Sequence, residues 1–135
     1  ESLLREVTAS HPEMHEVQYS LGLLLAEEKQ YDEAAKSLKQ AAQGMPERAR
    51  IHYNLGLLLQ HLKKDSDAEA SLLKAQELEP DNFDYLYALA EFYLKRRKLL
   101  QAKSIAEEMV ARHPAQKIGH DILDLIENNL GTHSD

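Results

Sequence analysis

Apolar residues recur along this chain at the spacing of one helix face. Two successive stripes have this spacing, formed by Leu21, Leu24 and Leu25 and then by Ala34, Leu38 and Ala41. Residues three and four apart lie on the same face of an α-helix, so each stripe predicts an amphipathic helix. The polar residues 27–30 between the stripes predict a tight turn. Together these features indicate a helical hairpin.

The hairpin pattern repeats every 34 residues. Segment 19–25, which reads Tyr-Ser-Leu-Gly-Leu-Leu-Leu, aligns with segment 53–59 and more loosely with segment 87–93. All four prolines share the same spacing, and they are Pro12, Pro46, Pro80 and Pro114. A fixed period of this length is typical of stacked structural repeats. Because the residue before a proline disfavours the helical conformation, we expect each proline to close a repeat.

The repeated spacing of small and apolar residues resembles the tetratricopeptide repeat family, and the resemblance covers residues 15–116 in three full repeats. The matching residues, besides the prolines, are Leu21-Gly22, Leu55-Gly56, Ala34, Ala68 and Ala102. The resemblance implies an all-α fold, a right-handed superhelical solenoid of helix-turn-helix hairpins with half-repeats at both ends. The chain departs from the family at its large aromatic sites, which are Gln18, His52 and Leu86 in place of Trp, and Leu38, Leu72 and Ala106 in place of Phe or Tyr.

We expect a single solenoid domain over residues 1–131. Its parts are the second helix of a truncated repeat (1–14), three full repeats (15–48, 49–82 and 83–116) and a C-terminal helix (117–131). The last helix carries Ile118, Ile122, Leu125 and Ile126 on one stripe and is expected to stop at Gly131. Residues 132–135 are expected to form a frayed tail, and the chain is expected to be an excised piece of a longer protein.

Several finer features of the hairpins are predicted from the same register. Small residues are expected to face one another across each hairpin, with Gly22, Gly56 and Ala90 opposite Ala34, Ala68 and Ala102. Asp32, and Ser66 together with Glu69, are expected to cap the second helices. The predicted core consists of Leu21, Leu25, Ala34, Leu38, Leu55, Leu59, Ala68, Leu72, Leu89 and Ala102.

Composition narrows the possible partners. The chain has 135 residues, with 16 basic and 23 acidic side chains and a net charge of −7, which repels nucleic-acid backbones and anionic membrane surfaces. It has no cysteine, so thiolate metal sites and disulfides are excluded within this chain. No apolar run approaches the roughly 20 residues needed to cross a bilayer. We therefore expect a soluble protein, with a cytoplasmic or a periplasmic location both left open.

Candidate chemistry is sparse. The five glycines are scattered, so no phosphate-binding loop is predicted. His11 and His15 are separated by Pro12 at a helix junction and do not share a helix face, and His52 and His120 occupy large-residue core positions where a packed histidine suffices. The carboxylates are expected on solvated helix faces. We therefore predict a non-catalytic protein without a metal or a cofactor.

The family resemblance implies that the first helix of each repeat lines a concave groove. The candidate peptide-binding residues there are Tyr19, Leu23, Tyr53, Asn54, Leu57, Tyr87 and Glu91. Tyrosine is common at its position in the family, so a purely structural role for the three tyrosines remains the alternative. Leu23 and Leu57 stand where the family usually has Asn, and exposed leucines in a groove favour a ligand that covers them.

Two further comparisons with the family shape the expected partner. The clamp that some members use for acidic chaperone tails would need Lys, Asn, Asn, Lys and Arg, whereas this chain has Tyr19, Leu23, Asn54, Asp84 and Ala88 there. Only one position matches, so chaperone-tail binding is disfavoured. Glu16, Arg50 and Asp84 alternate in sign and are expected to form an exposed salt-bridge ladder. The expected partner is a protein or peptide segment that is apolar with basic residues.

Two alternatives from other functional classes remain. The ends expose Leu3, Leu4, Ile118, Ile122 and Leu125 in this interpretation, so the repeats could serve self-association by end-to-end stacking. The chain could also be the repeat region of a larger enzyme or of a multihaem cytochrome, because residues 85–114 faintly resemble repeats attached to periplasmic members of that class.

Overall fold

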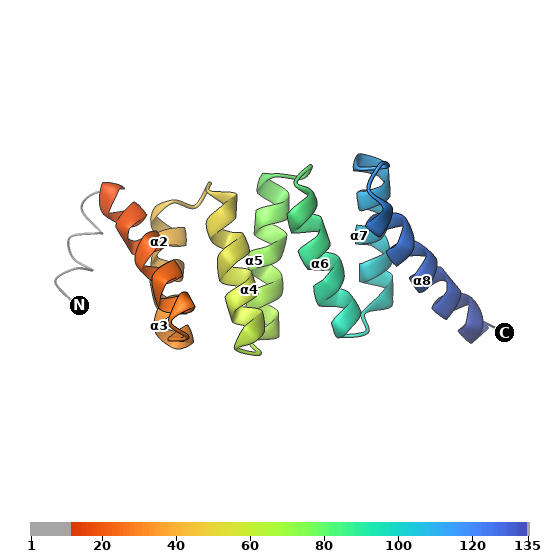
Figure 1. Cartoon of the computed structure of the whole chain (residues 1–135), viewed down its shortest axis with the longest axis horizontal. Coiled ribbons are helices and arrows are strands. Elements are labelled where there is room, and N and C mark those ends of the chain that lie inside the picture. The colour runs from red at the N-terminus through yellow and green to blue at the C-terminus, as the bar shows by residue number, and fades with distance from the viewer. Residues whose placement is uncertain (1–11, 135) are drawn as a thin grey trace. The chain divides into compact units, whose positions relative to one another are not determined.

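The computed structural model describes residues 12–134, and every regular element in that range is an α-helix. The helices are α2 (Pro12–Glu27), α3 (Tyr31–Gly44), α4 (Ala49–His61), α5 (Asp65–Leu78), α6 (Phe83–Lys95), α7 (Leu99–Arg112) and α8 (Lys117–Ser134). The predicted all-α fold is confirmed (Figure 1). The chain divides into two compact units after Leu78, so α2 to α5 belong to the first unit and α6 to α8 to the second.

Consecutive helices pack as hairpins within each unit. In the first unit α2 packs on α3 and α4 on α5, and α3 also packs on α4. In the second unit α6 packs on α7, which in turn packs on α8. The predicted helix-turn-helix pairs are therefore present (Figure 1). Pro46, Pro80 and Pro114 lie in the connections between hairpins, whereas Pro12 is the first residue of α2, a position where its missing N–H costs nothing.

Some residues of the predicted core are more exposed than expected. Its seven buried members are Ala34, Leu38, Leu55, Ala68, Leu72, Leu89 and Ala102. Leu21, Leu25 and Leu59 are only half-buried, and Leu25 and Leu59 pack against the buried cluster from its edge. The register of the three alanines was predicted correctly, since each is fully buried.

Glycine at the eighth position of a repeat allows the two helices of a hairpin to approach closely. A Cβ atom added at Gly56 would lie 2.8 Å from Leu72 Cδ2 and 3.2 Å from the Leu72 backbone nitrogen. A Cβ atom at Gly22 would lie 2.7 Å from Leu38 Cδ2. The nearest neighbours of these glycines are thus leucines one turn beyond Ala34 and Ala68, which corrects the predicted small-to-small contact. The leucine side chain uses the space that glycine leaves empty.

The tight turns inside the hairpins place a non-glycine residue in the left-handed conformation. Lys29, Lys63 and Arg97 have φ angles of 64°, 62° and 58°, and they are 34 residues apart. At Lys63 two backbone bonds close the turn, from Lys63 N to Gln60 O at 3.0 Å and from Lys64 N to Leu59 O at 2.9 Å. This is the Schellman pattern, which normally has glycine at this position.

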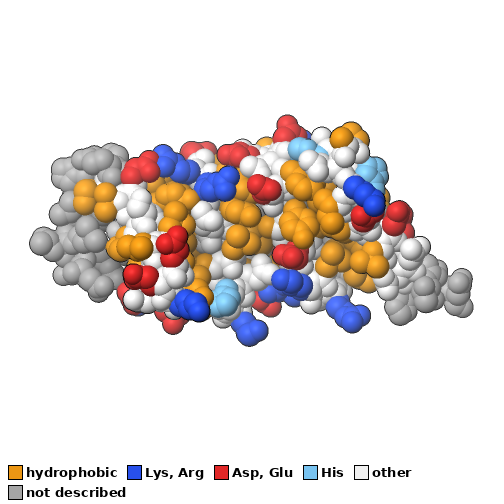
Figure 2. Space-filling model, viewed as in Figure 1, with side chains coloured by type: hydrophobic (Ala, Val, Ile, Leu, Met, Phe, Trp, Pro, Cys, Tyr) orange, Lys and Arg blue, Asp and Glu red, His pale blue; other side chains and the backbone are white. Residues whose placement is uncertain are grey.

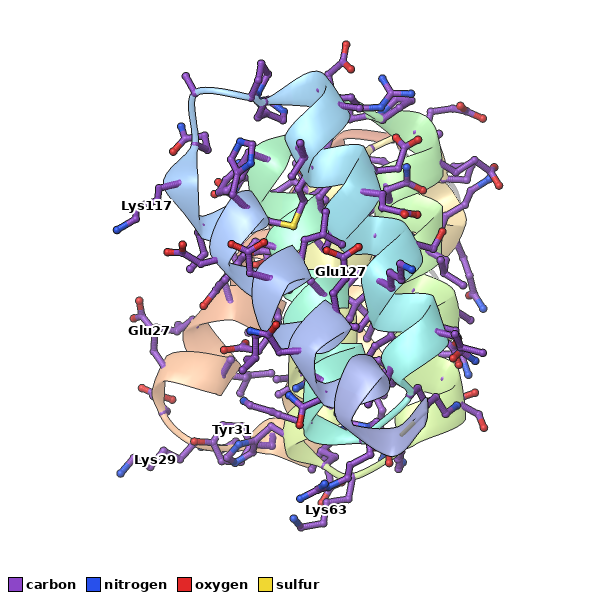
Figure 3. All side chains as sticks on the ribbon, turned by 90° about the vertical axis from the view of Figure 1, so that its right-hand side faces the viewer. Glu27, Lys29, Tyr31, Lys63, Lys117 and Glu127 are labelled. Carbon is purple, nitrogen blue, oxygen red and sulfur yellow. The ribbon has the colours of Figure 1, made fainter. Side chains whose placement is uncertain are left out.

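Replacing Lys63 by glycine is expected to stabilise the chain. Figure 3 shows the Lys63 side chain pointing away from the helices at the end of a turn, so its removal costs no packing. Glycine adopts a positive φ without the steric penalty that an L side chain carries. We expect the free energy of unfolding to rise by about 0.5–1 kcal/mol, measured by urea denaturation. Lys63→Ala, which keeps the penalty, is the control and should leave stability nearly unchanged.

Both predicted N-caps of the second helices are wrong. The helix α3 begins at Tyr31 with Gln30 as its N-cap residue, so Asp32 lies inside the first turn. The helix α5 begins at Asp65, which places Ser66 inside that helix as well. A side-chain cap is present at α6, where Asn82 Oδ1 accepts a hydrogen bond from Tyr85 N at 3.3 Å. Both helices begin two residues earlier than the predicted caps imply.

Histidine at the position where the family usually has Trp ties the hairpin to the preceding connection. His52 Nε2 donates to the carbonyl oxygen of Pro46 at 2.9 Å. The equivalent His120 donates to the carbonyl oxygen of Pro114, also at 2.9 Å. These side chains therefore have a structural partner, and a role in metal binding is not needed to explain them.

The C-terminal helix differs from the prediction. It continues through Gly131 to Ser134, so it neither stops at the glycine nor leaves residues 132–134 irregular. Ile122 and Ile126 are buried, whereas Ile118 and Leu125 are exposed. Ile122 was expected among the exposed end residues, and it is covered because α8 packs on α7 through this side. Leu3 and Leu4 lie outside the described residues.

An ion-pair network closes the second unit at the end of α7. Arg112 pairs with Glu108 at 2.5 Å and with Asp81, which lies just before α6. Hydrogen bonds to these two carboxylates raise the pKa of Arg112, with Glu108 the larger cause. His113 Nε2 also donates to the carbonyl oxygen of Asp81 at 2.6 Å. The two ends of the α6–α7 hairpin are thereby held together.

Candidate peptide-binding groove

Two exposed leucines mark the same turn of α2 and α4. Leu23 is 37% exposed and Leu57 is 38% exposed; the next leucine is also exposed on α2 (Leu24, 51%) but is buried on α4 (Leu58, 7%). Each stands four residues after a tyrosine, Tyr19 on α2 and Tyr53 on α4, so tyrosine and leucine share one face of their helix. We call these four residues the groove strip.

A hydrogen bond joins two of the predicted groove residues. Asn54 Nδ2 on α4 donates to the Tyr19 hydroxyl oxygen on α2 at 2.7 Å. This bond brings the corresponding faces of α2 and α4 together in the first unit. Because the Tyr19 oxygen accepts this bond, its own hydrogen remains to be donated, and Asn54 keeps a carbonyl oxygen and a second N–H. The pair therefore presents both a donor and an acceptor beside the groove strip.

Charged side chains flank the groove strip. The Arg50 guanidinium lies 5.8 Å from the centroid of the Tyr53 ring, within the range of a cation–π contact. Glu16 pairs with Arg48 at 2.6 Å, a partner that the predicted ladder of Glu16, Arg50 and Asp84 did not include. Arg48 was missed because it precedes α4 and lies outside the aligned helix positions. Such exposed pairs contribute little to stability, so this one chiefly sets the local charge.

A pair of packed rings that the sequence did not predict lies at the C-terminal end of α4, beyond the groove strip. Tyr31, the first residue of α3, packs on His61, the last residue of α4, with ring centroids 4.3 Å apart. Glu27 at the end of α2 is exposed, and Figure 3 shows it pointing outward near Tyr31. No spacing rule in the sequence connects Tyr31 to His61, since the two belong to different hairpins.

The remaining candidates lie on α6 in the second unit. Tyr87 is 37% exposed. Glu91, four residues later, pairs with Lys95 at 3.9 Å with its side chain 43% exposed. Ala88, which stands at one of the family's clamp positions, is only 5% exposed and belongs to the packed side of α6. Tyr87 and Glu91 therefore share an accessible face of this helix.

These surfaces offer apolar contacts and hydrogen bonds to a ligand. In the described part of the chain no three His, Asp or Glu side chains are grouped so that they could hold a metal ion. Among residues 12–134 no helix is both long and apolar enough to cross a bilayer. Figure 2 shows hydrophobic side chains over α2 and α4, with charged side chains among and around them. This arrangement suits an extended or helical peptide that has apolar side chains.

Two family models, both described as tetratricopeptide repeat, match the chain over residues 1–45 and 25–85. No curated protein sequence matches it.

Solved structures similar to this chain are repeat proteins of the same fold. MamA has a TM-score of 0.79 at 20% identity, covering 95% of this chain and 75% of MamA. The first such domain of Spaghetti (RPAP3), bound to an HSP90 peptide, has a TM-score of 0.76 at 20% identity, covering 90% of this chain and 96% of that one. The Yersinia enterocolitica type III secretion chaperone SycD, in complex with a peptide of the translocator YopD, has a TM-score of 0.74 at 17% identity, covering 84% and 92%. At these identities the likeness shows the fold.

Proposed function

Because the chain belongs to the tetratricopeptide repeat family, we propose that it is a non-catalytic scaffold that binds a segment of a partner protein along the groove strip. Two of the similar structures contain a bound peptide, an HSP90 peptide in one and a YopD peptide in the other. Peptide binding is thus compatible with this fold, and the residues that would select the ligand are those of this chain.

The exposure of Leu23 and Leu57 is the observation that carries the proposal. Exposure of a leucine side chain to water is energetically unfavourable. Two exposed leucines at equivalent turns of neighbouring hairpins form an apolar patch, whereas scattered surface leucines do not. The Tyr19–Asn54 pair lies beside them with a free donor and acceptor, which suits the alternating donors and acceptors of a peptide backbone. The occupant is therefore an apolar segment whose backbone bonds to this pair.

Charge near the strip distinguishes the ligand further. Glu27 is exposed at one end of α2. Its carboxylate favours a basic residue within or next to the apolar segment. An acidic chaperone tail is not proposed, since Leu23, Asp84 and Ala88 stand where the clamp of such binders needs Asn, Lys and Arg.

The double substitution of Leu23 and Leu57 by asparagine tests the groove. A peptide selected from a displayed random library against the wild-type chain would be titrated into both proteins. Covering the exposed third of each leucine contributes about a third of 1.5–3 kcal/mol, so losing both should weaken binding about tenfold. Thermal unfolding by circular dichroism should change little because both side chains are already exposed.

A matched control uses two other exposed leucines, Leu24 on α2 and Leu73 on α5, which are 51% and 39% exposed and lie off the strip. Their replacement by asparagine should leave affinity unchanged. Equal loss in both double variants would indicate a nonspecific apolar effect. Unchanged affinity in the strip variant, with intact helicity, would show that the peptide binds elsewhere.

Self-association is the second candidate function, and one observation favours it. Val17 and Leu24 on α2 are 48% and 51% exposed, whereas Ile51 and Leu58 at the equivalent positions of α4 are buried. Val17 and Leu24 are therefore exposed apolar side chains of α2, and a second copy of the chain could cover them. In that case the selected peptide would compete with self-association only if it bound α2 through these side chains.

A further inference from the structure

A second recessed surface lies in the first unit. It is a hollow of about 340 Å³ between α3 and α5, and its floor includes Leu55 and Leu59 of α4. Leu57 lies two residues from each of these leucines, about 200° around the helix. The hollow and the groove strip are therefore on opposite sides of α4.

The floor of the hollow is apolar, and it stays open because small side chains face it from both walls. Ala35 comes from α3 and Ala70 from α5, and neither fills the space above Leu59, which is only half-buried. The volume is at the lower end of the range for small-molecule pockets, about 300–1,000 Å³. One bulky aliphatic side chain of a larger ligand would occupy it.

Charges of both signs lie at the rim of the hollow. Lys36, Lys39 and Lys64 line it together with Asp32 and Asp67, on a chain with a net charge of −7. Lys36 pairs with Glu33 at 3.4 Å. Lys39 and Lys64 make no ion pair with another described residue.

The position of the aspartates leaves one end of the hollow without a lining carboxylate. Asp32 and Asp67 both lie in the first turn of their helices, α3 and α5. Lys39 is seven residues beyond Asp32, about two helical turns away. Ser71 is the lining residue of α5 nearest this end, and its hydroxyl can donate a hydrogen bond. An anionic group is therefore favoured beside Lys39.

We propose that this hollow is a second binding site, which takes an acidic peptide segment that carries one bulky aliphatic side chain. The aliphatic side chain packs on Leu59, Ala35 and Ala70. Carboxylates on either side of it pair with Lys39 and with Lys64. These lysines come from opposite walls, so a chain that crosses the hollow reaches both, whereas a single small anion reaches one. The ligand has the opposite charge from the segment proposed for the groove strip.

A pair of peptides with the same aliphatic centre and opposite charges tests this site. The isotope-labelled chain would be titrated at low salt with acetylated and amidated Glu-Glu-Leu-Glu-Glu, and separately with Lys-Lys-Leu-Lys-Lys, while backbone amide shifts are recorded. We expect the acidic peptide to shift residues 32–39 and 64–71, and added salt to weaken it. Equal binding of the basic peptide, shifts confined to residues 19–23 and 53–57, or no binding at millimolar peptide would overturn the proposal.

Variants on the walls separate the two parts of the site. Ala70→Leu should abolish the shifts by filling the hollow, and the fold should persist because Ala70 is exposed. Lys39→Gln with Lys64→Gln should weaken binding about two- to thirtyfold, as expected for two exposed ion pairs. Lys117→Gln makes the same change of charge per residue at a side chain that points into solvent (Figure 3), and it should have no effect.

The groove variant distinguishes this site from the groove strip. If Leu23→Asn with Leu57→Asn removes binding of the acidic peptide while Ala70→Leu does not, the hollow is not its site and the proposal fails. If the groove variant binds the acidic peptide as well as the wild type does and Ala70→Leu does not bind it, the hollow is confirmed whatever the outcome for the groove ligand.

Discussion

Replacing Leu55 by alanine is expected to lower the free energy of unfolding by about 2–5 kcal/mol. Leu55 is 6% exposed and belongs to a buried cluster with Ala34, Leu38 and Leu58. Alanine would remove apolar contacts and leave a cavity. The helices cannot move closer to fill it, because Gly56 already packs closely on Leu72. Urea denaturation followed by circular dichroism measures the change.

Leu57→Ala is the matched control, because it makes the same change two residues away on the same helix. Its side chain is 38% exposed, so the loss should be under about 1 kcal/mol. A loss below about half a kcal/mol for Leu55→Ala, or a larger loss for Leu57→Ala than for Leu55→Ala, would mean that the opposite side of α4 faces the core.

Replacing Phe92 by alanine is expected to destabilise the chain by about 3–5 kcal/mol. The ring is 1% exposed, and it packs edge to face on Tyr93 with centroids 5.5 Å apart. The Arg96 guanidinium lies 3.8 Å from the Phe92 ring centroid. Alanine would lose the buried apolar area and would also remove the ring that faces this cation. The same denaturation measurement applies.

Phe92→Leu separates these two contributions. Leucine keeps most of the apolar volume but has no aromatic face for Arg96, so we expect a loss of about 1–1.5 kcal/mol. If leucine is as destabilising as alanine, the aromatic contacts dominate over volume. If alanine itself costs less than about 1 kcal/mol, Phe92 is not part of the core.

Much of the fold could be predicted because its main signals are local. The buried alanines Ala34, Ala68 and Ala102 recur at the 34-residue period, and a helix can bury only the face on which such residues align. The polar stretch at residues 27–30 correctly indicated a turn. The left-handed conformation at Lys29 within it was not predicted, because lysine carries no sequence signal for a positive φ.

The candidate groove was harder to predict than the fold, because the exposure of a side chain depends on which helices pack around it. Leu24 and Leu58 occupy equivalent repeat positions, yet Leu24 is 51% exposed and Leu58 only 7%. The difference arises because α4 packs on α3 through the face that holds Leu58. The hydrogen bond between Tyr19 and Asn54 likewise joins residues 35 apart, and neither residue type indicates the other as its partner.

The sequence by itself determined that this protein is all-helical, that its helices pair as hairpins and that the hairpins belong to one repeat family. Those properties follow from apolar spacing within a helix and from a fixed period along the chain. Only the tertiary structure decided which leucines stay exposed and that Tyr19 bonds to Asn54. It also decided that Lys39 and Lys64 face one hollow above Leu55 and Leu59. The physical reason is that these features arise where separate helices pack, so the distance between side chains is set by backbone approach and not by their separation in sequence.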